Sequence, residues 1–164
     1  MARIYVETTI ASFYHDERPE PEMVARRNWT RRWFDNALTG GDDLVTSLAV
    51  EAELRAGNFP HREAALELIA DLPLIDLDES VANIVDAYIR HHVMPTDPQG
   101  DALHLAAASF HRCDFLVTWN CRHLANANKF GHIHRVNAHL GIGNPVLVTP
   151  LELLDEEPTD EQHA

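Results

Sequence analysis

Two polar side chains of this chain directly follow segments that are expected to form buried strands. Glu7 comes after the β-favouring run 3–6, and Asn120 lies two residues after the apolar run 115–118. Because the carboxyl ends of parallel strands meet at one edge of an open α/β sheet, where sites of such folds lie, we expect these two side chains to converge. A third strand at 44–46 leads into a helix that brings two more acids, Glu51 and Glu53, toward the same edge.

The two helix glutamates are distinguished by their neighbours one turn away. Glu51 has Arg55 at i+4, the favourable order for a surface ion pair that contributes about 0.2–0.5 kcal/mol. The neighbours of Glu53 are small and apolar: Ala49, Val50, Ala56 and Gly57. A carboxylate on such a packed face is costly unless it is paired, protonated or bound to a metal. Glu53 is therefore the candidate, and the alternative is a glutamate at the edge of the buried face.

Asp101 lies in the first turn of the helix expected at 97–111, with His104 one turn further on. Its helical neighbours are mostly apolar, so Asp101 either faces the site or only complements the helix dipole. Asp97 is better explained as the N-cap, because Pro98 follows it at the first helical position. His104 could hydrogen-bond to Asp101, or it could be a histidine at the edge of the core.

Several carboxylates that meet in one cleft repel one another, and a divalent cation removes that repulsion. Mg²⁺ prefers oxygen ligands and keeps several waters, so a few carboxylates are enough to hold it. A cation bound in this way can activate water and stabilise charge during displacement at phosphorus. Glu7, Glu53 and Asp101 are the expected ligands, with Asn120 completing the shell. Thr8 and Thr118 flank the cleft, where they could orient a water or a carboxylate or simply bond to the ends of the strands.

The elements that must position these residues alternate between short strands and longer helices. The expected strands are 3–6, 44–46, 74–77, 115–118 and 146–148. The expected helices are 8–14, 22–38, 48–56, 60–72, 81–92, 97–111 and 150–154. This alternation predicts an α/β fold with three layers, α/β/α, around a central, mostly parallel sheet. We expect one domain over residues 1–154 and a polar C-terminal tail over 155–164.

Composition and charge exclude several classes of protein. The 164 residues are 45% hydrophobic and 24% charged, which is globular composition. No apolar run approaches the roughly 18 residues of a membrane span, so no membrane partner is expected. The net charge of −13 repels polyanions and, taken alone, argues against a nucleic-acid partner. An acid at position 7 does not suit a signal peptide, which favours a cytoplasmic protein.

The cysteines and histidines are weaker candidates for chemistry. Cys113 and Cys121 are too few for a disulfide framework and are more simply explained as small buried residues. The chain has eleven histidines, but none lie in a known zinc-binding spacing. His132 and His134 could be two ligands on one face of a strand.

A basic stripe with aromatic neighbours follows the first strand. It contains Arg26, Arg27 and Arg31, and Arg122 lies close to Asn120. These arginines could hold RNA phosphates, or they could receive a protein partner. The alternative is a solvated arginine face over a tryptophan-bearing core stripe.

Four segments, in this order, resemble the PIN-domain nucleases and especially the VapC-like toxins of toxin–antitoxin pairs. The segments are 4–9 (IYVETT), 47–57 (SLAVEAELRAG), 100–106 (GDALHLA) and 115–124 (FLVTWNCRHL). The resemblance implies a Mg²⁺- or Mn²⁺-dependent ribonuclease with Glu7, Glu53, Asp101 and Asn120 as its acidic quartet. It also implies a small antitoxin as a partner.

The chain departs from the family pattern at two positions. The first acid of the family is usually aspartate, and here it is Glu7; the fourth position is often aspartate, and here it is Asn120. Three hypotheses follow: a metal-dependent endoribonuclease, a PIN-fold module with little or no activity that binds RNA or protein, and an α/β domain whose acids are structural. RNA, an antitoxin and a second copy of the chain are the partners to test.

Overall fold

The computed structural model describes residues 1–94 and 99–154. Within these ranges the chain forms four strands and eight helices. The strands are β1 (Arg3–Val6), β2 (Asp43–Val45), β3 (Phe115–Val117) and β4 (Val146–Val148). The helices are α1 (Thr8–Tyr14), α2 (Pro21–Thr39), α3 (Leu48–Ala56), α4 (Arg62–Ile69), α5 (Glu79–Arg90), α6 (Gln99–Phe110), α7 (Ala127–Leu140) and α8 (Pro150–Leu153). The predicted cap Asp97 and the predicted tail 155–164 lie outside the described residues.

The four strands form one parallel sheet in the order β2-β1-β3-β4. Tyr5 of β1 is paired with Val45 of β2 on one side and with Leu116 of β3 on the other. Leu116 is paired in turn with Leu147 of β4. All four strands point the same way, so the residues that follow them lie along a single edge of the sheet.

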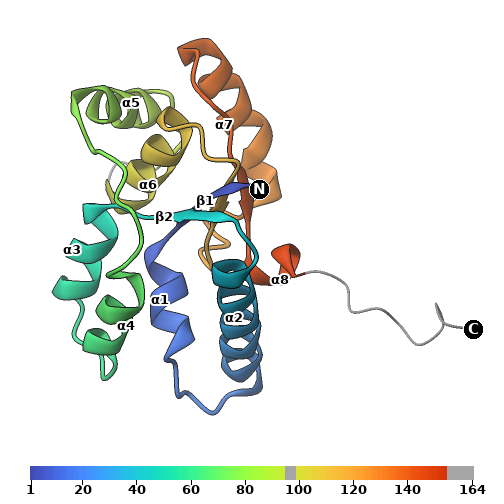
Figure 1. Ribbon diagram of the computed structural model, residues 1–164. Coiled ribbons are helices and arrows are strands. Elements are labelled where there is room, and N and C mark those ends of the chain that lie inside the picture. Colours follow the sequence, from blue (N-terminus) through green and yellow to red (C-terminus); the bar gives the residue numbers. More distant parts are fainter. Residues whose placement is uncertain (95–98, 155–164) are drawn as a thin grey trace, which may run out of the picture.

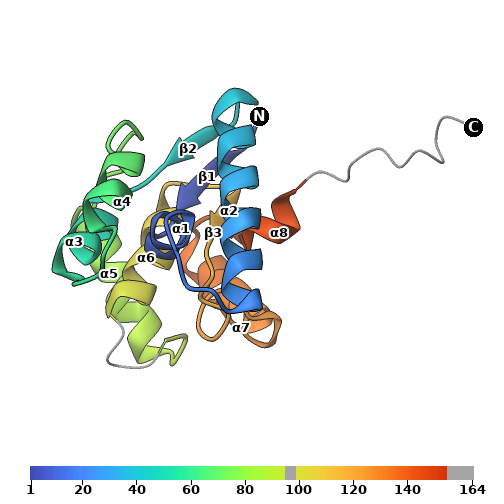
Figure 2. The same ribbon diagram turned by 90° about the horizontal axis from the view of Figure 1, so that it is seen from below.

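Helices cover both faces of this sheet, and the predicted α/β fold with three layers is confirmed. Figures 1 and 2 show α3 to α6 on one side and α2 and α8 on the other, with α1 continuing beyond the end of β1. Helix α7 packs beside α5 and α6, because its buried Asn137 bonds to Tyr88 of α5 and Ser109 of α6. Apart from the exposed Arg3 at the start of β1, the two central strands are apolar, and Tyr5, Val6, Leu116 and Val117 have no exposed surface. This burial is what a parallel strand covered on both faces requires.

The strand predicted at 74–77 is wrong. Leu74 makes only an isolated bridge to Thr46, through hydrogen bonds from Thr46 N to the Pro73 carbonyl (3.0 Å) and from Ile75 N to the Thr46 carbonyl (2.9 Å). The chain then leaves the edge of the sheet and reaches Asp78, whose side chain caps α5. The segment with alternating apolar residues is too short to pair with β2 beyond this one bridge.

Helix α7 was not predicted, and it changes the interpretation of two histidines. Asn126 caps its first turn, and Gly141 ends it with a left-handed φ of 69°. Its inward side is marked by Ile133, Val136 and the polar Asn137, all buried. His132 and His134 therefore lie on a helix and point in different directions, not along one face of a strand.

Among residues 1–94 and 99–154, no helix combines the length and the apolar character needed to cross a membrane.

Candidate functional site

Glu7 lies between β1 and α1. Its backbone N–H donates to the Val117 carbonyl of β3, and its side chain caps the first turn of α1. The residue is 4% exposed and is the N-cap of α1. Its Oε2 accepts hydrogen bonds from Thr9 N (3.0 Å), Thr9 Oγ1 (2.5 Å) and Thr118 Oγ1 (2.8 Å). No hydrogen bond from the described residues reaches Oε1. Burial raises the pKa of Glu7, although His104 and the threonine hydrogen bonds oppose the rise.

Glu53 approaches Glu7 from α3, a helix capped by Ser47 and preceded by β2. Thr8 Oγ1 donates a hydrogen bond to its Oε2 (2.5 Å), and its Oε1 lies 2.9 Å from His104 Nε2. Burial works to raise the pKa of Glu53, but the hydrogen bonds and the charge of His104 outweigh burial and lower it. Glu51 instead pairs with Arg55 on the outside of the helix (2.9 Å), as the spacing predicted.

His104 is buried, with 1% of its surface exposed, and both of its ring nitrogens have partners. Nε2 faces Glu53, and Nδ1 lies 2.6 Å from the Tyr5 hydroxyl. Of the two roles considered for His104, the hydrogen bond to Asp101 is not formed, because the ring nitrogens bond to Glu53 of α3 and Tyr5 of β1. Burial lowers the pKa of His104, but the Glu53 hydrogen bond and the charges of Glu7, Glu53 and Asp101 raise it overall.

Asp101 and Asn120 form a second pair beside this cluster. Asn120 Nδ2 donates to Asp101 Oδ1 (2.9 Å), while Asn120 Oδ1 accepts from the backbone N–H groups of Arg122 and His123. The amide of Asn120 is therefore fixed in one orientation. Burial and the charge of Glu53 raise the pKa of Asp101, and the Asn120 hydrogen bond and nearby histidines only partly offset this rise.

Thr118 connects the two halves of the site. Its hydroxyl donates to Glu7 and accepts from Asn120 N (2.9 Å), so one side chain fixes both. Thr8 and Thr118 thus orient carboxylates, one of the two roles considered for them. The hydrogen bond of Thr118 to Asn120 N also ties down the end of the strand, which was the other role.

Glu7, Glu53 and His104 together could hold a metal ion. One ligand atom from each lies within 4.8 Å of the others. Glu7 Oε1 accepts no hydrogen bond from the described residues and is not among the buried atoms that lack a partner, so this oxygen is accessible and free to bind a cation. Asp101 is not part of this group of three, but it lies close enough for Glu53 and His104 to shift its pKa. The structure thus brings the four predicted residues to one edge and adds His104 to them.

Three residues of the site were not predicted from the sequence. Thr9 holds Glu7, and Tyr5 holds His104. Gly100 packs so closely on α3 that a Cβ there would lie 2.4 Å from Glu53 Oε1. A signal for Gly100 was present, because a glycine directly before a candidate acid indicates close approach of the backbone.

Most of the arginines expected to contact RNA or a partner interact with other residues of the chain. Arg26 pairs with Glu22 (3.0 Å) and lies over the ring of Trp119. Arg27 donates to the Asp16 carbonyl (3.3 Å), and Arg31 donates to the Tyr14 carbonyl (2.6 Å). Arg122 differs from these three, because its residue is exposed and its guanidinium has no hydrogen bond from the described residues.

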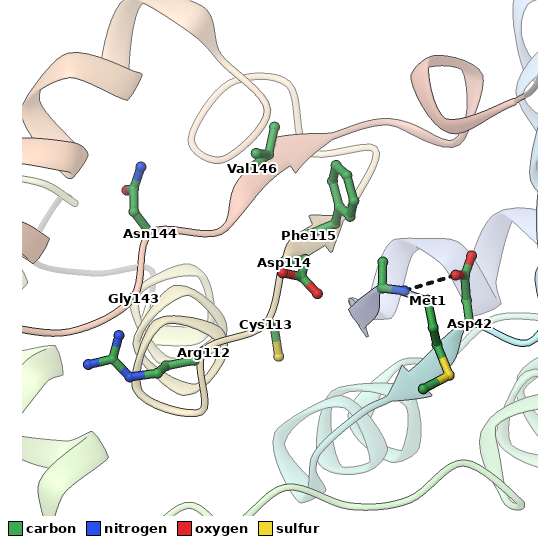
Figure 3. Close-up of a pocket in the computed structure, with 10 residues that line it drawn as sticks. Met1, Asp42, Arg112, Cys113, Asp114, Phe115, Gly143, Asn144 and Val146 are labelled. Atoms are coloured by element: carbon green, nitrogen blue, oxygen red, sulfur yellow. Dashed lines mark hydrogen bonds between the residues drawn. The ribbon is translucent and has the colours of Figure 1, made fainter.

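A depression of about 690 Å³ lies at the opposite, amino-terminal edge of the sheet (Figure 3). A hydrogen bond from Ala2 N to Asp42 (3.1 Å) runs along it, and Cys113 is among its lining residues. Burial raises the pKa of Cys113 to about 11, so the thiol stays protonated at neutral pH. Cys121, expected to be buried, is exposed. None of Glu7, Glu53 and His104, which form the candidate metal site among the described residues, lines this depression.

Comparison with protein-family models gave no match, and no curated protein matches the chain. We therefore base the function on the geometry of the site at the carboxyl edge of the sheet.

Proposed function

We propose that the protein is a metal-dependent endoribonuclease of PIN-domain type. The observation that supports this best is the carboxylate of Glu7, which is buried, is held through Oε2 by three donors, and has a ligand oxygen within 4.8 Å of ligand atoms of Glu53 and His104. Such an arrangement costs stability in the free protein, because burial disfavours the charged form. A cation-binding role explains why that cost is present.

The residues that would hold Mg²⁺ or Mn²⁺ are Glu7, Glu53 and Asp101. A cation held there would supply activation of water and compensation of charge at phosphorus. A P–O bond to the water oxygen would form as the P–O3′ bond breaks, which gives 5′-phosphate and 3′-hydroxyl ends. Thr8 and Thr118 keep the two glutamates in place, so the ligands need not be reordered on binding.

Asn120 takes the place of a fourth acid in this proposal. Its amide donates to Asp101 and thereby orients the carboxylate, but it brings no charge. Arg122, exposed beside it, is the arginine best placed to contact an RNA phosphate. We further propose that the protein is the toxin of a toxin–antitoxin pair; this rests on the motif resemblance described above.

The test is cleavage of a mixed pool of RNA by the purified chain, with Mg²⁺, with Mn²⁺ and with EDTA. We expect cleavage only with a divalent cation, and a loss of at least 100-fold in Asp101→Asn and Glu53→Gln. Glu51→Gln is the matched control, because Glu51 lies on the same helix and pairs outward with Arg55. Cleavage that continues in EDTA, or that survives in Asp101→Asn, would contradict the proposal.

A PIN-fold module that binds without cleaving is the second candidate, favoured by the uncharged Asn120. Binding of RNA, a co-purified small protein or a second copy of the chain, without cleavage under any metal condition, would support it. Acids with a purely structural role remain the third hypothesis, and they predict neither binding nor cleavage.

A further inference from the structure

His104 occupies a position that neither a packing role nor the acidic quartet accounts for. It is almost fully buried, yet it reaches the same space as the two glutamates. Both ring nitrogens have partners, as any buried imidazole requires, but here the partner of Nε2 is a carboxylate and a second carboxylate lies within 4.8 Å. Its Nε2 is the atom that shares this space with Glu7 and Glu53.

The distances suit a shared cation. Two ligands bonded to one cation at about 2.1 Å are about 3.0 Å apart when they are adjacent in an octahedron. His104 Nε2 and Glu53 Oε1 are 2.9 Å apart, and the ligand atoms of all three residues lie within 4.8 Å of one another. Glu7 brings the third donor, and its three hydrogen bonds are all on Oε2, so Oε1 can bind a cation without displacing them.

The far side of the His104 ring is also arranged as a metal-binding histidine requires. For Nε2 to bind a cation, the ring proton must sit on Nδ1, where it needs an acceptor. The Tyr5 hydroxyl oxygen lies 2.6 Å from Nδ1 and can accept that proton's hydrogen bond. Tyr5 can then donate its own proton to Ser47 Oγ, 2.8 Å away. No heavy atom of this chain of hydrogen bonds has to move.

We propose that His104 Nε2 is a direct cation ligand beside the carboxylates of Glu7 and Glu53. The mixed nitrogen and oxygen donors make the site prefer divalent ions of the first transition row over Mg²⁺, which favours oxygen ligands. This inference rests on the proposed metal site and adds both a ligand and a metal selectivity to it. Tyr5 acts as a positioning residue, because it touches the ligand and not the cation.

The test uses Mn²⁺, the weakest-binding ion of that row and therefore the most demanding one. We expect the full chain, without RNA, to bind one Mn²⁺ at least tenfold more tightly than Mg²⁺. Pulsed electron paramagnetic resonance should show nitrogen-14 modulation from a coordinated imidazole. His104→Gln should lose the modulation and at least tenfold of the Mn²⁺ affinity, while its Mg²⁺ affinity changes less than about threefold. His139→Gln, which removes an exposed imidazole, should match the wild type.

A second variant covers the case in which His104→Gln does not fold. Tyr5→Phe keeps the ring of His104 but removes its Nδ1 partner, so Mn²⁺ affinity should fall about 10- to 100-fold with the nitrogen signal retained. Bound Mn²⁺ without nitrogen modulation would overturn the inference and leave the nuclease proposal standing. Nitrogen modulation without RNA cleavage would support the inference and contradict the nuclease. Failure to bind Mn²⁺ would also overturn the inference, and cleavage with Mg²⁺ would then decide the nuclease separately.

Discussion

The carboxylate of Glu7 is buried at a cost to the stability of the free protein. Its carboxylate is removed from water, and the three hydrogen bonds on Oε2 do not offset this, since its pKa is raised from its ordinary value of 4.5. Each pKa unit of such a shift corresponds to about 1.4 kcal/mol between the charged and neutral forms. The free protein is therefore less stable with Glu7 ionised than with Glu7 neutral.

Glu7→Gln should consequently stabilise the protein above the raised pKa. A group whose pKa is raised by folding contributes stability at low pH and loses it as the pH rises through the folded value. A glutamine can still accept the Oε2 hydrogen bonds, so the cap of α1 remains. We expect the variant to have a higher free energy of unfolding than the wild type at pH 8, by an amount set by the size of the pKa rise. Below pH 4.5 the two should converge.

The measurement is urea unfolding of both proteins in EDTA across this pH range. A wild type that is more stable than Glu7→Gln at pH 8, or a difference that does not depend on pH, would contradict the prediction. The same variant should lose metal binding, which separates the two effects of one side chain.

At the scale of single residues, the sequence indicated which side chains face the site, but it did not indicate their hydrogen-bond partners. Glu53 was separated from Glu51 by its apolar neighbours, and the structure turns the two in those directions. The partner of His104 was not predictable in this way. Its i−3 neighbour Asp101 is near in the helix, but Glu53 and Tyr5 come from other elements, and only the packing of α6 on α3 and β1 brings them within reach.

The first turn of α6 and the middle of α3 approach each other at the site, and Gly100 permits this approach. A Cβ at position 100 would lie 2.4 Å from Glu53 Oε1 and 3.4 Å from its Cδ. Because those atoms are at the far end of a flexible side chain, the glutamate can move away and the backbone need not. An added methyl group should therefore disturb the site more than the fold.

Gly100→Ala is expected to reduce the affinity for Mn²⁺ or Mg²⁺ at least tenfold, since Glu53 would leave His104. The free energy of unfolding should change by less than about 1 kcal/mol, because alanine also favours the helix. Gly131→Ala in α7 is the matched control: its nearest neighbour would be Arg135 Nη1 at 3.5 Å. It should keep the metal affinity and gain up to about 1 kcal/mol. Calorimetric titration and urea unfolding measure both quantities, and unchanged metal affinity in Gly100→Ala would contradict the prediction.

At the scale of elements, a helix could be predicted where apolar residues recur at helical spacing without a polar interruption. The helix at 48–56 was predicted with the bounds observed for α3, because a serine cap and a glycine stop mark its ends. Helix α7 was missed because its buried side includes Asn137, which hydrogen-bonds to the Tyr88 hydroxyl (2.6 Å). A polar residue in a buried position breaks the apolar pattern, and only the partner on another helix explains it.

The charge of the whole molecule limits how it could hold RNA. Acidic side chains number 26 against 13 lysines and arginines. On α2, Arg26 pairs with Glu22 of the same helix, and Arg27 and Arg31 bond to carbonyl groups of the preceding segment. Any contact with phosphates should therefore involve few cations. Arg122 is the best candidate for such a contact, because it is exposed and lies two residues after Asn120.

A shallow salt dependence should follow from this scarcity. For single strands the slope of log K against log[salt] is about −0.7 for each phosphate contacted, so we expect a slope no steeper than about −1.4. The measurement is fluorescence anisotropy of a labelled RNA with the Asp101→Asn protein over a series of KCl concentrations. Arg122→Gln should reduce the slope by about 0.7, whereas Arg31→Gln should leave it unchanged. A steep slope, or one that responds to Arg31, would show that the basic stripe on α2 holds RNA after all.

The position of β1 in the sheet has a consequence for how the protein is made. Glu7 and the Thr118 hydroxyl that holds it are 111 residues apart in the chain. Parallel strands joined by such long connections pair slowly, because the chain must lose much freedom before any contact rewards it. During synthesis, β1 therefore waits for β3, and the two halves of the site stay apart until residue 120 has emerged. If the protein is a nuclease, a nascent chain that ends before residue 120 therefore lacks an assembled site.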